Sequence, residues 1–406
     1  MNILFLDAYF EPEQISFTHL EKDLLEHLAG AGHSIEIICP TPSRGIDKET
    51  AKAYKSKRTE ALLGGKVNVS RFFAPRERKN PVARALRYFW CNFKTYKSAV
   101  KKKSVDVVFS NSTPPTQGFI AGKVAKKLRV PFVFSLQDIF PDSLVNAGMT
   151  KTGSLLYRIG RKIENYTYNN ADKIIVISEA FKQNIMAKGV PEEKIEVIPN
   201  WIDTESVKPI NRKDNKLFDE FNVCREKFIV LYAGNFGASQ GTDVIINAAD
   251  ILKDETDIRF VLFGGGSEFE RKKKEIAEKK LSNVILNSLL PAERISEVYS
   301  MGNVALITCK RGVGKSGMPS KTWSIMACNT PIIASFDTDG ELAGILKKSN
   351  AGICIEPENS NALAAAILAV KNDGCMPSGG RNYVLNNADK SVCLNKYVQT
   401  IENFKF

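Results

Sequence analysis

The chain has 406 residues, of which 43% are hydrophobic and 25% charged, and its formal net charge is +12. This composition is ordinary for a soluble globular protein, and the length suits two to three domains that need no disulfide or metal to hold their cores. Eight cysteines without a C-x-x-C pair and three histidines exclude the usual zinc spacing, and no apolar run approaches the ~18 residues of a membrane-spanning helix.

The first residues form an apolar strand followed by acidic residues, which is not the pattern of a signal peptide and predicts a cytoplasmic protein. From there strands and helices alternate, with a helix at 17–31 whose leucines recur at helical spacing. Apolar strands are expected at 2–7, 34–39, 67–73, 105–110, 132–136 and 173–178. Near-continuous apolar strands separated by helices are typical of a parallel sheet that is covered on both faces.

A basic and aromatic segment spans residues 71–103, and acidic residues nearly vanish after Glu77. Six of its apolar side chains fall on one stripe of a predicted helix, flanked by arginines and lysines: Val82, Leu86, Phe89, Phe93, Tyr96 and Val100. One interpretation is an ordinary amphipathic helix that buries this stripe. The other is a helix that docks on an anionic membrane surface, with aromatic rings at the headgroups and basic groups on phosphates. The sequence leaves both open, because the stripe can pack while its rim touches lipid.

The alternation begins again in the second half of the chain. Strands are expected at 228–233, 259–263, 284–286, 304–308, 331–334 and 352–355, and helices at 242–252 and 268–280. These elements predict two doubly wound α/β units: an N-terminal domain at 1–205, a C-terminal domain at 206–385, and a helix at 386–406 that could cross back to the first domain. Ligands of such sheets bind at the carboxyl ends of the strands, which predicts an active site in a cleft between two facing sheets.

Residues 312–321 form a small, basic, glycine-bearing loop before a predicted helix. The run Gly314-Lys315-Ser316 superficially resembles a nucleoside-triphosphate P-loop, but Cys309 stands where that motif needs a glycine, so we reject this interpretation. Backbone N–H groups and the cations Lys315 and Lys321 suit a different phosphate-bearing ligand. A solvated turn is the alternative that composition alone leaves open.

Several motifs follow the order of a known family. They are GHSI at 32–35, QDIFPD at 137–142, IPNWID at 198–203, AGNFG and GTD within 233–243, and PSK followed by NTPIIAS within 319–335. In this order they resemble glycosyltransferase family 4, whose members have the GT-B fold of two facing Rossmann-like domains. The QDIFPD segment is similar to that of the WbuB-like enzymes, which build bacterial surface polysaccharides.

The family pattern is incomplete in this chain. Most members hold the donor sugar and ribose with two glutamates, at positions that are Ser316 and Ser324 here. Most neutralise the donor diphosphate with an arginine and a lysine, at positions that are Asn235 and Gln240 here. The lysines of the 312–321 loop would therefore have to supply this charge.

The resemblance implies a nucleotide-sugar donor site in the C-terminal domain. It assigns donor contacts to Asn235, Gly237, Gln240, Gly265, Leu290, Lys315, Ser316, Gly317, Met318, Pro319, Ser320 and Glu341. Lys321 is the expected catalytic cation, which would stabilise the charge that develops on the leaving diphosphate. No divalent metal or other cofactor is expected, because lysine and backbone donors would perform that task.

The N-terminal domain would bind the acceptor, near Phe17, Thr18 and His19 at the start of the first helix and near Gln137, where many members have a histidine. Asp138 follows an apolar strand and is the candidate catalytic residue that would orient the acceptor hydroxyl or act as its base. A cap or turn role is the alternative for Asp138, and a surface role is the alternative for His19.

The resemblance, taken with these features, implies an enzyme that moves a sugar, an N-acetylated or deoxy hexose, from a UDP-linked donor to a lipid-linked saccharide with retention. Such a reaction belongs to O-antigen or capsule synthesis, and the protein would be peripheral on the inner face of the cytoplasmic membrane and bind no nucleic acid. Two alternatives stay open. One is a UDP-N-acetylglucosamine 2-epimerase, and the other is a non-catalytic membrane- or nucleic-acid-binding protein whose donor site is degenerate.

Overall fold

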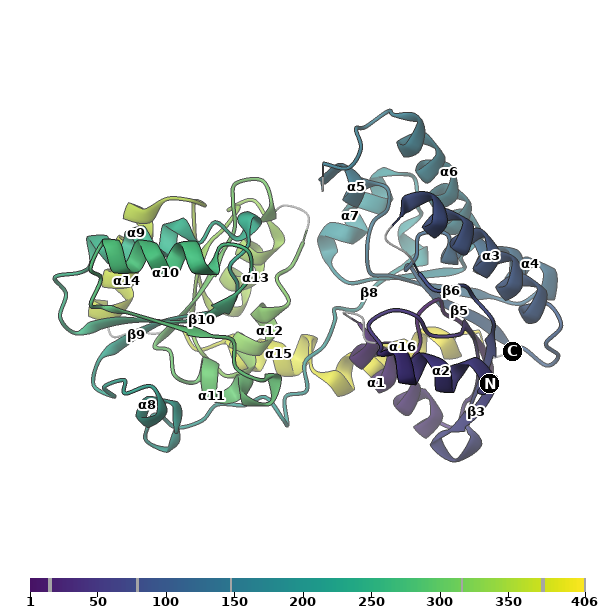
Figure 1. The fold of residues 1–406 in the computed structure, drawn as a ribbon, viewed down its shortest axis with the longest axis horizontal. Coiled ribbons are helices and arrows are strands. Elements are labelled where there is room, and N and C mark those ends of the chain that lie inside the picture. The colour runs from purple at the N-terminus through teal and green to yellow at the C-terminus, as the bar shows by residue number, and fades with distance from the viewer. Residues whose placement is uncertain (14–16, 78–79, 147, 315–316, 374–376, 405–406) are drawn as a thin grey trace. The chain divides into compact units, whose positions relative to one another are not determined.

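The computed structural model describes residues 1–406 apart from 14–16, 78–79, 147, 315–316, 374–376 and 405–406. The chain divides into two compact units, each built on a β-sheet with helices packed against it (Figure 1). Unit 1 contains Met1–Pro199 and the chain from Leu394 on, and unit 2 contains Asn200–Cys393. The first change of unit thus lies close to the boundary expected after residue 205, and the return to unit 1 lies later than residue 386.

A mostly parallel sheet forms the centre of unit 1, with strand order β3-β4-β2-β1-β5-β6-β7-β8. Its strands are β1 (Asn2–Leu6), β2 (Ser34–Pro40), β3 (Thr59–Leu62), β4 (Val67–Phe72), β5 (Val107–Asn111), β6 (Phe132–Leu136), β7 (Lys173–Val176) and β8 (Ile195–Val197). Only the edge strand β3 is antiparallel to its neighbour among the described pairs. The sequence predicted the parallel core, whereas β3 was not predicted.

The helices of unit 1 are α1 (Thr18–Gly30), α2 (Lys48–Ser56), α3 (Pro81–Ala99), α4 (Gln117–Leu128), α5 (Asp142–Asn146), α6 (Leu155–Asn170), α7 (Glu179–Ala187) and most of α16 (Lys390–Glu402). α4 packs against both α3 and α6. On α16, the Tyr397 ring centroid lies 6.3 Å from that of Phe109, and its hydroxyl lies 3.2 Å from Ser135 Oγ. The C-terminal helix therefore packs against β5 and β6 of unit 1.

Unit 2 contains a fully parallel sheet with strand order β11-β10-β9-β12-β13-β14. The strands are β9 (Phe228–Asn235), β10 (Ile258–Gly265), β11 (Val284–Ser288), β12 (Val304–Thr308), β13 (Ile332–Ser335) and β14 (Gly352–Ile355). The helices are α8 (Leu217–Glu220), α9 (Asp243–Ile251), α10 (Phe269–Glu278), α11 (Ile295–Tyr299), α12 (Lys321–Ala327), α13 (Glu341–Ser349), α14 (Ser360–Asp373) and α15 (Gly380–Asn387). The order of the strands is the predicted one, as are α9, α10 and the helix after the 312–321 loop, whereas the bounds of the other helices were not predicted.

The side chains of β9 alternate between two hydrophobic cores, one on each face of the second sheet. Val230 and Tyr232 pack with α9 and α14, whereas Ile229 and Leu231 pack with α11 and α12. Figure 1 shows the same division, with α9, α10 and α14 on one face and α11, α12 and α15 on the other. Because both faces are covered, the carboxyl ends of the strands are the edge left for a ligand.

Candidate active site

A pocket of about 500 Å³ opens at the carboxyl ends of the central strands of unit 2. Its described lining is Ala233, Gly234, Asn235, Ser239, Gln240, Phe263, Leu289, Leu290, Pro291, Ala292, Ile295, Val298, Tyr299, Ile307, Thr308, Cys309, Val313, Gly317, Met318, Pro319, Ser320, Lys321 and Phe336. Within this described lining, Lys321 is the only Lys, Arg, His, Asp or Glu residue. The pocket therefore combines apolar walls with one cation, a combination suited to an anionic ligand with an apolar part.

Lys321 is the first residue of α12, and its position depends on the end of β9. Its Nζ lies 4.3 Å from the centroid of the Tyr232 ring, within the range of a cation–π contact. A Cβ atom on Gly234 would lie 2.4 Å from the same Nζ, and Gly234 has φ +154. The absence of a side chain at Gly234 is therefore what leaves room for the ammonium group.

The ammonium group of Lys321 has no counter-charge in the described part of the chain. Burial lowers the pKa of Lys321 to about 8, although the residue keeps some exposure through the pocket. No carboxylate among the described residues forms an ion pair with it. A desolvated cation of this kind gains most from an anionic ligand, which would restore its pKa and satisfy its hydrogen-bond donors.

The loop after β9 is fastened to the end of β12. Thr308 Oγ1 donates a hydrogen bond to the carbonyl oxygen of Gln240 at 2.7 Å, and the Lys310 N–H donates to the carbonyl oxygen of Ser239 at 2.9 Å. Gly241 has φ +58, and a Cβ there would lie 3.0 Å from the Cys309 carbonyl, so the turn requires glycine. These contacts fix the polar side of the pocket.

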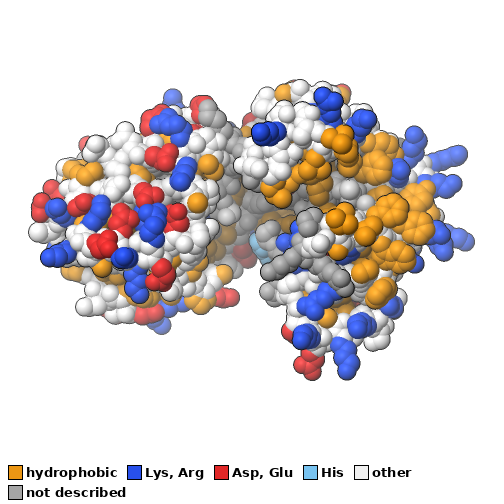
Figure 2. Space-filling view, turned by 45° about the horizontal axis from the view of Figure 1, so that its top comes forward, with side chains coloured by type: hydrophobic (Ala, Val, Ile, Leu, Met, Phe, Trp, Pro, Cys, Tyr) orange, Lys and Arg blue, Asp and Glu red, His pale blue; other side chains and the backbone are white. Residues whose placement is uncertain are grey.

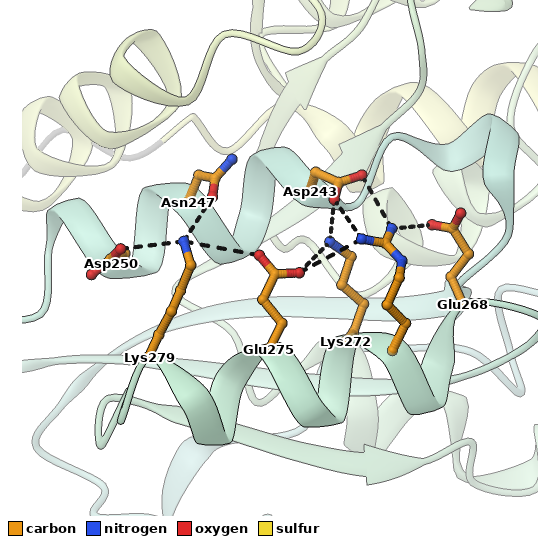
Figure 3. Close-up of polar contacts among 8 residues, drawn as sticks. Asp243, Asn247, Asp250, Glu268, Lys272, Glu275 and Lys279 are labelled. Atoms are coloured by element: carbon orange, nitrogen blue, oxygen red, sulfur yellow. Dashed lines mark hydrogen bonds and ion pairs between the residues drawn. The ribbon is translucent and has the colours of Figure 1, made fainter.

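A buried lysine holds the helix that follows this loop (Figure 3). The Lys272 side chain on α10 is fully buried, and its Nζ lies 2.5 Å from Asp243 Oδ1 and 2.9 Å from Glu275 Oε2. Burial alone would raise the pKa of Asp243, but hydrogen bonds from Lys272 and Arg271 lower it to about 2. Asp243 begins α9, so this cluster ties α9 to α10 directly behind the 235–241 loop.

Asp337 is a structural residue of the site that the sequence did not reveal. Its Oδ1 accepts a hydrogen bond from the Gly312 N–H at 2.9 Å, and its Oδ2 accepts one from the Gly314 N–H at 2.8 Å. The carboxylate therefore anchors the start of the predicted phosphate loop. The only signal in the sequence is a carboxylate soon after an apolar strand.

The predicted donor residues divide into three groups. Those that line the pocket together with Lys321 are Asn235, Gln240, Leu290, Gly317, Met318, Pro319 and Ser320. Those that do not line it are Gly237, Gly265 and Glu341, the last being the first residue of α13. Lys315 and Ser316 lie outside the described residues. The 312–321 loop therefore contributes its second part, 317–321, to the pocket as described.

The predicted acceptor residues lie at the carboxyl edge of the unit 1 sheet. Thr18 begins α1 after Phe17, and its Oγ1 donates to the Glu13 carbonyl at 3.2 Å, whereas His19 is exposed. Ser112 Oγ accepts hydrogen bonds from the N–H groups of Gln137, at 2.9 Å, and of Asp138, at 3.2 Å. This hydroxyl fixes the backbone that follows β6.

Asp138 itself is exposed at the end of β6. Its Oδ2 accepts a hydrogen bond from Ser143 Oγ at 2.9 Å. The same bond is what a local turn role would produce, so the catalytic role of Asp138 stays a prediction.

Buried carboxyl groups near the end of β1 were not predicted. Asp7 Oδ1 accepts hydrogen bonds from the N–H groups of Ala8 and Tyr9, at 2.8 and 3.3 Å. Burial raises the pKa of Asp7, and burial together with the neighbouring Asp7 raises that of Glu21 well above its usual range. Glu13 Oε1 accepts the Ser43 N–H at 2.7 Å, and burial raises the pKa of Glu13 to about 7. No sequence spacing signals this cluster.

The apolar stripe of α3 points mainly to solvent, so the interpretation that the helix buries it is wrong for its first half. Val82, Leu86 and Phe89 are 68%, 67% and 75% exposed. The buried positions of this helix are instead Arg87, Cys91, Thr95 and Ala99. Figure 2 shows hydrophobic side chains gathered on this unit and bordered by Lys and Arg side chains.

A second exposed apolar group lies at the start of α6 and was not predicted. It consists of Met149, Leu155, Leu156 and Ile159, of which Leu155 is 75% exposed. Within the described ranges no helix combines the length and the apolar character needed to cross a bilayer. The same ranges contain no group of three or more His, Cys, Asp or Glu side chains placed to hold a metal ion.

Two family models match successive parts of the chain. The model described as Glycosyltransferase Family 4 matches residues 22–206, and the one described as Glycosyl transferases group 1 matches residues 213–390. Among curated relatives, the Pseudomonas aeruginosa protein with the name Probable glycosyltransferase WbjE is 26% identical over 347 residues, covering 84% of this chain and 86% of that protein. A second relative is WcaI of Escherichia coli strain K12, whose name describes a glycosyl transferase of colanic acid biosynthesis. It is 25% identical, and the alignment covers 99% of this chain and 100% of WcaI.

Solved structures with the same fold include two that align over nearly the whole chain. Anabaena HepE, in complex with UDP, has a TM-score of 0.71 at 16% identity and covers 99% of this chain and 100% of its own. Sucrose-phosphate synthase from Thermosynechococcus elongatus has a TM-score of 0.71 at 17% identity, and the alignment covers 99% of this chain and 98% of the synthase chain. At these identities the likeness concerns the fold, and it confirms the predicted GT-B architecture.

Proposed function

Because the chain belongs to glycosyltransferase family 4, we propose that it transfers a hexose, N-acetylated or deoxy, from a UDP-sugar to a lipid-linked saccharide. The reaction would retain the anomeric configuration, as the family resemblance implies, and would serve the synthesis of a bacterial O-antigen or capsule. The name of WcaI, which refers to colanic acid biosynthesis, supports a place in the synthesis of a bacterial polysaccharide, and the name of WbjE supports glycosyl transfer. The complex of HepE with UDP supports the choice of nucleotide.

The observation that carries the proposal is Lys321 in the pocket of unit 2, which forms no ion pair with any residue that the structure describes. A leaving nucleoside diphosphate gains negative charge as the glycosidic bond to the sugar breaks. Lys321 would meet this charge in a pocket whose described lining contains no carboxylate to oppose it. Electrostatic stabilisation is strongest where water is scarce, and the burial that lowers the pKa of Lys321 provides that condition.

The rest of the pocket suits the nucleoside part of the donor. Its volume of about 500 Å³ falls in the range of small-ligand sites. Leu289 and Leu290 follow β11 and provide apolar contacts for a base, while Asn235 and Gln240 provide side-chain amides near the β9 end. In this proposal Lys321 and the amides do the work of a divalent metal, so transfer would proceed without one.

Unit 1 would present the acceptor hydroxyl, with Asp138 as its orienting group or base. Phe17, Thr18, His19 and Gln137 are the proposed acceptor contacts, on the basis of the resemblance. The position of Asp138 at the carboxyl end of β6 supports this role, because parallel sheets bind their ligands at that edge.

The proposed binding to a membrane surface rests on the exposed apolar side chains of α3 and of the start of α6. Crossover helices in a parallel sheet begin at the carboxyl ends of the strands, so both apolar groups lie toward the edge at which we propose that the acceptor binds. No acidic residue occurs between Glu77 and Asp106 or between Asp142 and Glu164. A basic and apolar surface of this kind favours the anionic inner face of the cytoplasmic membrane.

A panel of nucleotide sugars tests the function. We expect UDP-sugars to raise the unfolding temperature of the protein more than GDP-sugars at equal concentration, since a bound ligand stabilises by mass action. The UDP-sugar with the largest shift should then transfer its labelled sugar to a lipid extract in EDTA, and the product should retain the donor's anomeric configuration. Stabilisation by GDP-sugars alone, or an inverted product, would overturn the proposal.

A further inference from the structure

Unit 1 contains a basic pocket that is separate from the proposed donor site of unit 2. It has a volume of about 510 Å³ and lies where β2 and β4 end. Three lysines of α2 and one arginine line it: Lys48, Lys52, Lys55 and Arg76. The described lining contains no acidic residue, so the pocket concentrates positive charge at the carboxyl edge of the sheet.

The spacing along α2 explains how three lysines reach one pocket. Lys48, Lys52 and Lys55 are four and three residues apart, which places them on one face of the helix. Like charges at these spacings repel one another and weaken an isolated helix. An arrangement that costs stability in the free protein is understandable if an anion normally lies among the three ammonium groups.

The cations of the pocket contrast with their neighbours. Close by in sequence, Lys57 and Arg71 both form ion pairs with Glu60. By contrast, Lys48, Lys52, Lys55 and Arg76 have no ion pair with any described residue. Their donors are available to a ligand, and Lys and Arg are the side chains that bind phosphate groups most readily.

The pocket is fastened to the exposed apolar helix. On α3, Arg87 Nη2 donates to Ser43 Oγ at 3.1 Å, and its Nε donates to the carbonyl oxygen of Pro75 at 2.9 Å. Trp90 Nε1 donates to the carbonyl oxygen of Phe73 at 2.9 Å. Ser43 and Phe73 both line the pocket, so these bonds join its wall to the middle of α3.

The rim of the pocket is apolar where it meets α3. Phe73 lines the pocket and is 52% exposed, and Trp90 beside it is 38% exposed. From there the exposed side chains of Phe89 and Leu86 continue along the helix. A ligand that fits both parts has a phosphate head and a hydrocarbon tail.

We propose that this pocket binds the diphosphate of the lipid-linked acceptor, while the tail lies along α3 in the membrane. The proposal rests on the proposed function for the presence of such an acceptor, and it adds the site and the chemistry that hold it. Four cations suit a diphosphate better than a single phosphate, because a diphosphate carries more charge over a greater length. The saccharide of the acceptor would then extend along the carboxyl edge of the sheet.

Farnesyl diphosphate, used below its micellar concentration, is the probe that tests this site. The triple variant Lys48→Ala, Lys52→Ala, Lys55→Ala should bind it about tenfold or more weakly than the wild type. The matched control is Lys273→Ala, Lys347→Ala, Lys348→Ala, which removes three exposed lysines from unit 2 and should leave the affinity unchanged. All three proteins should unfold at closely similar temperatures, since the substituted side chains are exposed.

Two comparisons separate the possible sources of the phosphate. Inorganic diphosphate should bind at least tenfold more weakly than farnesyl diphosphate, and vesicles of phosphatidylglycerol should lose less affinity than farnesyl diphosphate on the triple substitution. Equal affinity of the wild type and the triple variant for farnesyl diphosphate would overturn the proposal. The proposal would also be overturned if inorganic diphosphate bound as tightly as farnesyl diphosphate. It would likewise be overturned if the triple substitution weakened binding to the vesicles alone.

A UDP titration of the same proteins keeps the two proposals apart. Loss of farnesyl diphosphate binding with unchanged UDP binding supports both the acceptor site and the donor site. If the triple variant loses farnesyl diphosphate binding but even the wild type does not bind UDP, the result would contradict the proposed donor while supporting the basic pocket. Retained farnesyl diphosphate binding with normal UDP binding would contradict the pocket alone.

Discussion

Lys321 Nζ lies 4.3 Å from the centre of the Tyr232 ring, near the point where β9 gives way to the 235–241 loop of the unit 2 pocket. The negative face of the aromatic ring attracts this ammonium group, which has no carboxylate partner among the described residues. A cation–π contact contributes about 0.5–2 kcal/mol and leaves the positive charge in place. The cation is thus held in position without being neutralised.

Gly234 makes this arrangement possible, and its substitution is the first prediction. Gly234→Ala places a Cβ 2.4 Å from Lys321 Nζ at a φ of +154, so the lysine must move and the backbone is strained. We expect UDP affinity to fall by about tenfold. Isothermal titration measures it, with Gly344→Ala as the control because a Cβ there meets nothing within 4 Å. Unchanged UDP affinity in Gly234→Ala would show that Lys321 does not contact the nucleotide.

The second prediction concerns pH. The pKa of Lys321 in the free protein is about 8, so the side chain loses its proton as pH rises through 8. Nucleotide affinity should therefore be constant below this value and fall by about tenfold by pH 9. Lys321→Arg stays charged throughout and should lack this decline. Parallel declines in the wild type and the arginine variant would locate the titrating group elsewhere.

The third prediction concerns the charged cluster of Lys272, Asp243 and Glu275 behind the 235–241 loop. Asp243→Asn leaves the buried Lys272 with Glu275 as its remaining carboxylate among the described partners. Because Asp243 is about half exposed, we expect a loss of ~1–2 kcal/mol in the free energy of unfolding, below the range for fully buried pairs. Urea titration, followed by a signal from unit 2, measures this free energy of unfolding. Asp250→Asn, which removes a carboxylate from the more exposed Lys253 and Lys279, should cost less.

The same carboxylate has a defined acid dependence. The pKa of Asp243 is about 2 in the folded protein, below its ordinary value of 3.8. Its contribution is therefore present above pH 3.8 and lost as pH falls through about 2. The difference in stability between wild type and Asp243→Asn should shrink over this window, and a constant difference down to pH 2 would contradict the ion-pair account.

The fourth prediction concerns the apolar face of α3. Leu86 and Phe89 are 67% and 75% exposed, so their replacement by serine should change the unfolding free energy little. The double variant Leu86→Ser, Phe89→Ser should bind anionic vesicles about tenfold more weakly, because less apolar surface enters the interface. Vesicle co-sedimentation at low salt measures this, with Ile251→Ser in unit 2 as the exposed control. Equal sedimentation of the double variant and the wild type would exclude this face as the lipid contact.

The sequence was a reliable guide wherever local pattern decides the structure. The parallel strands follow from apolar runs bounded by helices, and the placement of Lys321 beside the β9 loop follows from the order of the motifs. Other features depend on partners far apart in the chain. Asp337 reaches back to Gly312 and Gly314, and the buried Lys272 pairs with Asp243, which lies on another helix.

The orientation of α3 is a further feature that the local sequence pattern could not predict. Its stripe of apolar residues has the spacing of a buried face, yet the helix packs through Arg87, Cys91 and Thr95. Arg87 is buried because Pro75 and Ser43 accept its hydrogen bonds, and these acceptors come from loops that no helical periodicity describes. Amphipathic spacing alone therefore could not tell which face is inside.

The measurement that tests the central claim most directly is a calorimetric titration of UDP into wild type and Lys321→Ala at pH 7. The control is Lys348→Ala, which removes an exposed lysine elsewhere in unit 2. Loss of one charge-assisted contact predicts about 10- to 100-fold weaker binding to Lys321→Ala, with the control equal to wild type. Equal UDP affinity in all three proteins would contradict the assignment of the unit 2 pocket, and of Lys321 within it, to the donor diphosphate.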